Sequence, residues 1–202
     1  MSNCPNLERL NLSQSGTGDH DDTAALDLSD LDLSHCTSLR EFHLRANSIG
    51  DLNISALTAL EVISLSMPYY PDNSVIPNQI TSLDLSNNTN LRNVYINTVK
   101  SLTTINFTNC PALEYLDAWN NGLTALDVST ATTGGDGNTL EIVQAPFCNL
   151  SFVDISGQLN IGQSTYTILF DHNPLLETIQ CTGSNLMEKS YSSSYYALYL
   201  NN

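Results

Sequence analysis

The chain has 202 residues and a formal net charge of −15, because 21 acidic side chains outnumber only 6 basic ones. Six cations cannot neutralise much of a phosphate backbone, so the composition argues against a nucleic-acid partner and against docking on anionic lipid headgroups. No apolar run approaches the roughly 20 residues of a membrane span, and the N-terminal stretch MSNCPNLERL lacks the pattern of a signal peptide. The length suits one domain or a short repeat array.

A repeated pattern of leucines and polar residues runs along most of the chain. The stretch LEYLDAWNNGL, residues 113–123, has the spacing LxxLxLxxNxL that is typical of a leucine-rich repeat. Segments of this first half-repeat begin, in chain order, at Leu7, Leu39, Leu60, Leu91, Leu113, Leu140 and Leu176. A related second half-repeat alternates with it and begins at Leu28, Ile49, Ile80, Leu102, Leu123, Leu150 and Thr165. Either 150–164 or 165–175 is the regular second half of its coil, and the spacing leaves both open.

One complete coil is 21 or 22 residues long, as in 39–60 and 91–113. The period of 2 within each LxL motif predicts one short strand per half, and a helix of ten or more residues does not fit. The expected fold is a leucine-rich repeat solenoid, mostly β, with a parallel sheet on its concave side, short strands or extended segments on its convex side, and little helix. We expect residues 1–202 to form one such domain of about seven coils, a fragment of a longer array.

Polar residues recur at the position after each strand where the side chain points inward. An Asn at this position can satisfy the buried backbone groups of the turn. We place Asn47, Asn121 and Cys148 at this position in the first half-repeat, and Asn88, Asn173, Cys4, Cys36 and Cys110 in the second. Cys181 takes an inward strand position that matches Ala118 and Ala145. We therefore expect all five cysteines to be buried structural thiols, not metal ligands or nucleophiles.

Four insertions interrupt the coils, and their Gly, Pro, Asn and Asp residues predict loops. They are 14–25, 66–79, 130–138 and 157–164. They either carry function or are tolerated variation in length. The stretch DHDD offers Asp19, Asp21 and Asp22 as weak candidates for calcium, but it lacks the EF-hand spacing. No catalytic or phosphate-binding motif is present, so we expect neither enzymatic activity nor a cofactor, with calcium as the one alternative.

Outward positions on the first-half strands hold the candidate binding residues. Near the middle of the concave face we expect His43, Arg45, Tyr95, Tyr115, Asp117 and Trp119. The loop that carries Tyr69 and Tyr70 is expected to form one side of this site. Aromatic side chains and an arginine in a polar surround are typical of interface hot spots, and also of sugar-stacking platforms. Cross-strand packing without a ligand is the alternative reading. A protein partner is the first hypothesis, a glycan the second and a structural spacer the third.

A column of outward acids and amides is expected on the second-half strands, at Asp32, Asn53, Asp84, Asn106, Asp127 and Asp154. We interpret it as an exposed structural feature, with weak cation binding as the sharper alternative.

The stretches LEYLDAWNNGLTALDVS and ITSLDLSNNTNLRNVYI resemble bacterial leucine-rich repeat surface proteins of the internalin-like and BspA-like kind. The resemblance covers roughly residues 4–186 and implies an exported or surface-attached protein that binds another molecule, often a protein and sometimes a glycan. On this basis we expect an extracellular or cell-surface location, with the signal peptide in a missing N-terminal part.

Overall fold

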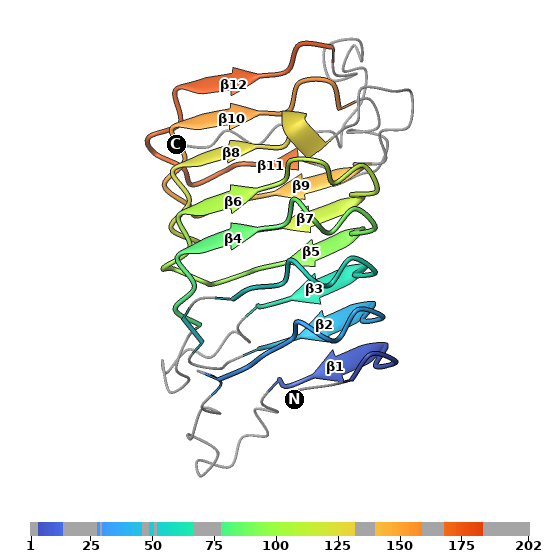
Figure 1. Ribbon diagram of the computed structural model, residues 1–202. Helices are drawn as coiled ribbons and strands as arrows, with labels where there is room; N and C mark the ends of the chain where they lie inside the picture. The colour runs from blue at the N-terminus through green and yellow to red at the C-terminus, as the bar shows by residue number, and fades with distance from the viewer. Residues whose placement is uncertain are drawn as a thin grey trace.

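The computed structural model describes residues 4–13, 28, 30–45, 49–50, 52–66, 78–131, 140–158 and 168–183 of the chain. They form a stack of short coils with one ladder of strands on each side (Figure 1). Every strand pair is parallel, and the register repeats from coil to coil. The described residues hold a single helical turn, Ser129–Ala131. The fold is therefore the mostly-β leucine-rich repeat solenoid that the sequence predicts.

The first ladder is a seven-stranded sheet in the order β1-β2-β3-β5-β7-β9-β11. Its strands are β1 (Arg9–Asn11), β2 (Glu41–His43), β3 (Val62–Ser64), β5 (Asn93–Tyr95), β7 (Tyr115–Asp117), β9 (Ile142–Gln144) and β11 (Ile168–Leu169). The first six of these strands lie in segments that the sequence assigns to the first half-repeat, which confirms that part of the prediction.

The second ladder consists of two sheets that continue one another along the stack (Figure 1). The two-stranded sheet pairs β4 (Ser82–Asp84) with β6 (Thr104–Asn106), and the three-stranded sheet has the order β12-β10-β8. These last strands are β8 (Ala125–Asp127), β10 (Phe152–Asp154) and β12 (Thr178–Gln180). The equivalent segments of the first two coils, at 31–33 and 52–54, form no strand but still bury Leu33 and Ile54.

The last two segments belong to the opposite halves from those predicted. Strand β11 pairs with β9 in the seven-stranded sheet, whereas β12 pairs with β10 in the second ladder. The segment from Thr165 is therefore a first half-repeat, and the segment from Leu176 is a second half-repeat. The choice between 150–164 and 165–175 is decided in favour of the former, because β10 pairs with β8. Asn173 moves to the first-half turn and Cys181 to the second-half strand as a consequence.

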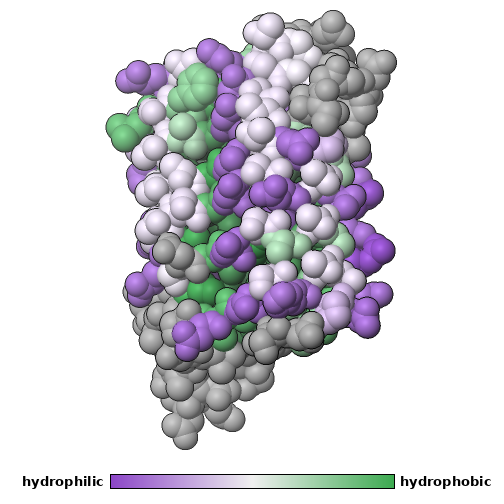
Figure 2. Space-filling view, in the orientation of Figure 1, coloured by the Kyte–Doolittle hydropathy of each residue, from purple (hydrophilic) through white to green (hydrophobic). Residues whose placement is uncertain are grey.

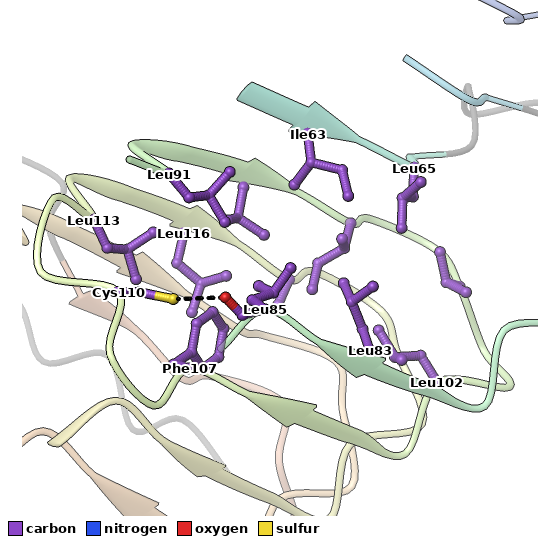
Figure 3. Packing of buried hydrophobic residues seen from close by; sticks show 14 of the residues in the cluster. Ile63, Leu65, Leu83, Leu85, Leu91, Leu102, Phe107, Cys110, Leu113 and Leu116 are labelled. Carbon is purple, nitrogen blue, oxygen red and sulfur yellow. Dashed lines mark hydrogen bonds between the residues drawn. The ribbon is translucent and has the colours of Figure 1, made fainter. Parts of the chain in front are cut away.

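The core is a column of apolar side chains that the two ladders share. In Figure 3, Ile63 and Leu65 from one ladder and Leu83 and Leu85 from the other point into this column. All four are at most 1% exposed. Each such side chain stabilises the fold by about 1.5–3 kcal/mol, and because one coil cannot bury its own leucines, the stack folds as a unit.

Turn asparagines satisfy buried backbone groups of the turn, as predicted, and they also connect successive coils. Asn121 Nδ2 donates to the Ala118 carbonyl at 2.8 Å, and its Oδ1 accepts from the Val99 amide of the preceding coil at 2.8 Å. Asn173 makes the same pair of bonds, to the Phe170 carbonyl of its own turn at 3.0 Å and from the Leu150 amide at 3.1 Å. It also donates to the Ala145 carbonyl of the preceding coil at 2.9 Å. At related positions, Asn78 near the end of the second insertion donates to the Leu44 and Leu65 carbonyls, and Cys110 donates to the Leu85 carbonyl. Asn47 lies outside the described residues.

None of the five cysteines forms a disulfide. Cys36, Cys110 and Cys148 are buried as predicted, but Cys4 and Cys181 are only half-buried, because each lies in a coil near one end of the described stack. Burial raises the pKa of Cys110 to about 12 and that of Cys148 to about 11, so both are poor nucleophiles.

Candidate functional site

The candidate site is the outward face of the seven-stranded sheet, where the register aligns side chains in columns along the stack. One column contains His43, Ser64, Tyr95, Asp117 and Gln144 on β2, β3, β5, β7 and β9. A second column precedes it by two residues and contains Glu41, Val62, Asn93, Tyr115 and Ile142. Neighbouring members of a column are about 5 Å apart, so their side chains touch.

Two groups of aromatic rings lie at the C-terminal part of this sheet. The rings of Tyr95 and Tyr115 are 5.1 Å apart and tilted by 38°. Further along, the Trp119 ring meets Phe147 edge-on at 5.9 Å, and Phe147 stacks on His172 at 4.0 Å with an angle of 11°. Strand β7 connects the groups because it carries Tyr115 and is followed by Trp119. We call these five residues the aromatic patch.

Phe147 and His172 were not among the predicted site residues. Phe147 is 44% exposed, a large fraction for an aromatic ring, and His172 is also exposed. His172 Nδ1 lies 2.6 Å from Asp171 Oδ2, which orients its ring. The sequence repeats contain the information needed to find this pair. Once 165–175 is assigned to the first half-repeat, Phe147 and His172 occupy the same turn position of neighbouring coils.

Left-handed backbone shapes this turn. The turn after each of four successive first-ladder strands has one residue with positive φ at the same position. These residues are Thr98, Asn120, Phe147 and His172, with φ values of 63°, 58°, 56° and 55°. The amides of Thr98, Asn120 and Phe147 donate to the carbonyls of Trp119, Pro146 and Asp171 in the next coil. Such φ values are costly for a residue with a Cβ, and least so for Asn. The repeated turn thus fixes the backbone on which the Phe147 and His172 rings stand.

Asp117 is a half-buried carboxylate between Tyr115 and Trp119 on the same face. Its Oδ2 accepts from Asn97 Nδ2 at 2.8 Å, and Asn97 Oδ1 accepts from the Trp119 amide at 3.2 Å. Burial raises the pKa of Asp117, while the bonds from Asn97 and the Trp119 amide act in the opposite direction. Burial also raises the pKa of Tyr115, helped by the charge of Asp117.

His43 and Arg45 lie on the same face, but β3 separates them from the aromatic patch. His43 Nε2 is 3.6 Å from Glu41 Oε2, and Arg45 Nε donates to Ser64 Oγ at 3.0 Å. The prediction therefore places these two residues on the right sheet, but they do not join the aromatic rings. Tyr69 and Tyr70, and the calcium candidates Asp19, Asp21 and Asp22, lie outside the described residues.

Arginine–glutamate pairs border the strand entrances of the sheet. Arg9 pairs with Glu41 at 2.6 Å, Arg40 with Glu61, and Arg92 with Glu114, in each case across to a neighbouring coil. Their side chains are substantially exposed, so each pair contributes at most about 1 kcal/mol. The pairs do, however, neutralise three of the basic side chains on this face.

The acidic column of the second half-repeat has a clear structural role. Each of its six members accepts a hydrogen bond at Oδ1 from the backbone amide two residues later, at 2.8–3.1 Å, for example from Ser86 to Asp84 and from Ser156 to Asp154. These are Asx turns, and the four of them that lie in strands mark the last residue of the strand. Asn106 Nδ2 also donates to Asp84 Oδ1 at 3.0 Å, which offsets repulsion between neighbours.

The surface in Figure 2 is dominated by hydrophilic and near-neutral side chains in rows along the stack, with apolar ones visible mainly in a narrow band between them. Within the described ranges, no group of three or more His, Cys, Asp or Glu residues is placed to hold a metal ion. No described helix is long and apolar enough to cross a membrane.

No family model matches the chain. Nor does any curated protein. Three chains among solved structures match, and one is the functional domain of InlJ from Listeria monocytogenes, which is described as including a cysteine ladder. The two chains are 21% identical with a TM-score of 0.37, and the similarity covers 76% of this chain and 46% of InlJ. The chain thus spans less than half of the InlJ chain, and at this TM-score the match does not assign a family.

Proposed function

We propose that this chain is a non-catalytic recognition scaffold that binds a protein through the aromatic patch of its seven-stranded sheet. The observation that carries the proposal is a set of three ring contacts in two groups, which together span four neighbouring coils. One group is Tyr95 with Tyr115, and the other is Trp119, Phe147 and His172. Tyr and Trp are the residues that most often dominate binding energy at protein interfaces.

The packing of the rings favours binding over simple coverage of the sheet. A ring that is already held by its neighbour loses little side-chain freedom when a partner arrives, so less of the interaction energy is spent on ordering it. Phe147 stays 44% exposed despite two ring contacts. A structural spacer needs no exposed aromatic ring at a strained turn, where Asn or Gly would fold at lower cost.

A glycan is the second candidate because exposed stacked rings also fit the apolar face of a sugar. Phe147, stacked on His172 and flanked by Asp171, supports this alternative. A location at the cell surface or outside the cell is part of the proposal, and the resemblance of the repeats to bacterial surface proteins supports it. Labelling of intact source cells with an antibody against the protein tests that location.

The proposal is tested by probing protein and glycan arrays with the wild type beside a Trp119→Ala, Tyr115→Ala double variant. We expect a protein ligand that binds the wild type and is lost by the double variant, while circular dichroism and the melting temperature show that the variant is folded. A ligand found only on the glycan array would replace the protein partner with a sugar. Absence of any ligand on both arrays, or equal binding by both proteins, would contradict the proposal.

A further inference from the structure

Three glutamates at the border of the seven-stranded sheet are paired with arginines, whereas a carboxylate on its outward face is not. Glu41, Glu61 and Glu114 each meet an arginine from a neighbouring coil. Asp117 has no ion-pair partner among the described residues, although it is half-buried and its partial removal from water raises its pKa. A carboxylate taken out of water without a cation is costly, so a fold optimised only for stability would not place one here.

The surroundings of Asp117 are built from aromatic rings and one amide. Tyr115 precedes it on β7, Trp119 follows two residues after the strand ends, and Tyr95 is its register partner on β5. The Tyr95 and Tyr115 rings contact one another, and the carboxylate is close enough to Tyr115 to affect its pKa. Asn97 Nδ2 donates to Oδ2 of the Asp117 carboxylate, and Asn97 Oδ1 accepts from the Trp119 amide. One side chain therefore fixes both the acid and the backbone that carries the Trp119 ring.

Aromatic rings beside a single fixed carboxylate suit a cationic ligand group. Aromatic faces attract cations, with a contribution of about 0.5–2 kcal/mol that grows as water is excluded. A carboxylate adds a charge-assisted hydrogen bond, and an Arg guanidinium also stacks flat on a ring. One acidic oxygen pair is too few for a calcium ion, which takes six to eight oxygen ligands. The acidic chain, with its net charge of −15, favours an approaching cation over a neutral group.

We infer that Asp117, with the rings of Tyr95, Tyr115 and Trp119, forms a recognition site for an arginine or lysine side chain of the protein partner. The inference rests on the proposed function, since it names the chemistry by which the partner would be held at the aromatic patch. It assigns Asp117 the role of selecting a cation, while the rings supply contact area.

The chain offers a convenient reporter because Trp119 is its only tryptophan. The test follows the Trp119 indole and Asn97 side-chain signals by nuclear magnetic resonance during titration with N-acetyl-arginine amide. The matched probe is N-acetyl-citrulline amide, which has nearly the same shape and no charge. We expect saturable shifts with the arginine probe and binding at least about fivefold weaker with the citrulline probe.

Two isosteric variants separate the site from the general charge of the protein. Asp117→Asn keeps a side-chain acceptor for Asn97, and we expect it to bind the arginine probe no better than the citrulline probe. Asp127→Asn removes the same charge from the second ladder, where Asp127 accepts from the Ser129 amide, and we expect it to bind like the wild type.

Equal binding of the two probes by the wild type would overturn the inference, and so would full binding of the arginine probe by Asp117→Asn. These outcomes leave the proposed function separately testable. An array ligand that needs Trp119 and Tyr115 but binds Asp117→Asn normally would support the recognition scaffold and refute cation selection. Loss of the same ligand in Asp117→Asn, with the fold unchanged, would support both.

Discussion

Asp117 ends β7, Asn97 follows the neighbouring strand β5 by two residues, and the side-chain amide of Asn97 holds the carboxylate of Asp117 at 2.8 Å. The same amide accepts the backbone N–H of Trp119 at 3.2 Å. A side chain from one coil thereby fixes both the acid and the start of the turn that presents Trp119 in the next coil. The relationship explains how a half-buried carboxylate is kept in place on a face of rings.

The first prediction concerns the cost of this carboxylate. Burial raises the pKa of Asp117 above its ordinary value of 3.8, so the native state binds the proton more tightly than the unfolded chain does. The contribution of Asp117 to the unfolding free energy therefore falls as pH rises from about 3.8 through the raised pKa, and its ionised form is unfavourable at neutral pH. We expect urea unfolding to show Asp117→Asn as at least as stable as wild type at pH 7, with the difference shrinking towards pH 4.

Asp84→Asn is the matched control with the opposite sign. The bonds that Asp84 accepts from the amide and hydroxyl of Ser86 lower its pKa, so its charge contributes stability above pH 3.8 that is lost as pH falls through the lowered pKa. A clear loss of stability in Asp117→Asn at pH 7 would mean that this carboxylate is there for the fold.

The second prediction concerns the Asx turns of the second ladder. Asp84→Ala removes acceptors for the Ser86 amide and for Asn106 Nδ2, both at 3.0 Å. We expect the variant to lose about 1–2 kcal/mol of unfolding free energy, measured by urea denaturation. Asp84→Asn should retain most of it, because Asn53 and Asn106 accept the same amide bond elsewhere in the column. If the Ala and Asn variants were equally stable, the turn bond would contribute nothing.

The third prediction concerns the strained turn of the first half-repeat. Thr98 has φ of 63°, which a β-branched residue rarely adopts, and Asn120 holds the same position in the next coil. Thr98→Asn should therefore raise the unfolding free energy by about 0.5–1 kcal/mol. Thr104→Asn, on β6, is the control and should lower it slightly, since Asn is unfavourable in a strand. Destabilisation by Thr98→Asn would show that its hydroxyl or methyl group has a role in the fold.

The fourth prediction concerns the thiols. Cys36, Cys110 and Cys148 are at most 4% exposed, whereas Cys4 and Cys181 are half-buried. Iodoacetamide at pH 8 should label Cys4 and Cys181 first in the native protein, because burial keeps the other three protonated and covered. Mass spectrometry should find five labels after unfolding without reductant. A mass deficit of one bridge, or early labelling of Cys110, would contradict this assignment.

Much of the fold follows directly from the sequence. The LxL motif has period 2, so Leu116 and Ala118 must point inward together and Asp117 outward. Asn121 could likewise be placed at the turn, since only a residue that donates and accepts satisfies the backbone groups there. Both half-repeats have the same inward spacing, however, so the leucines alone do not say to which ladder a segment belongs.

This ambiguity explains the error at 165–183. After an insertion, the alternation of halves can only be recovered from residues that differ between the ladders. Second-half segments carry Ser or Thr two residues after the acid or amide, as in Ser156, and Thr182 fits that rule. In the first ladder, β1 shares the pattern through Asn11 and Ser13, but the strands next to 165–175 do not. Reading Thr182 in this way would have placed β12 correctly. It would also have aligned His172 with Phe147, the stacked pair that the predicted site lacked.

The most direct test of the account compares matched aromatic substitutions on the two ladders. Titration of the ligand found on the arrays should give a Kd for wild type, for Trp119→Ala with Phe147→Ala, and for Phe152→Ala. Phe152 is an outward, half-buried ring on β10 of the second ladder. We predict a loss of about thirtyfold or more for the patch variant, equivalent to about 2 kcal/mol, and a Kd within about twofold of wild type for Phe152→Ala. Binding that survives the patch variant, or that is lost equally in Phe152→Ala, would contradict a recognition site on the seven-stranded sheet.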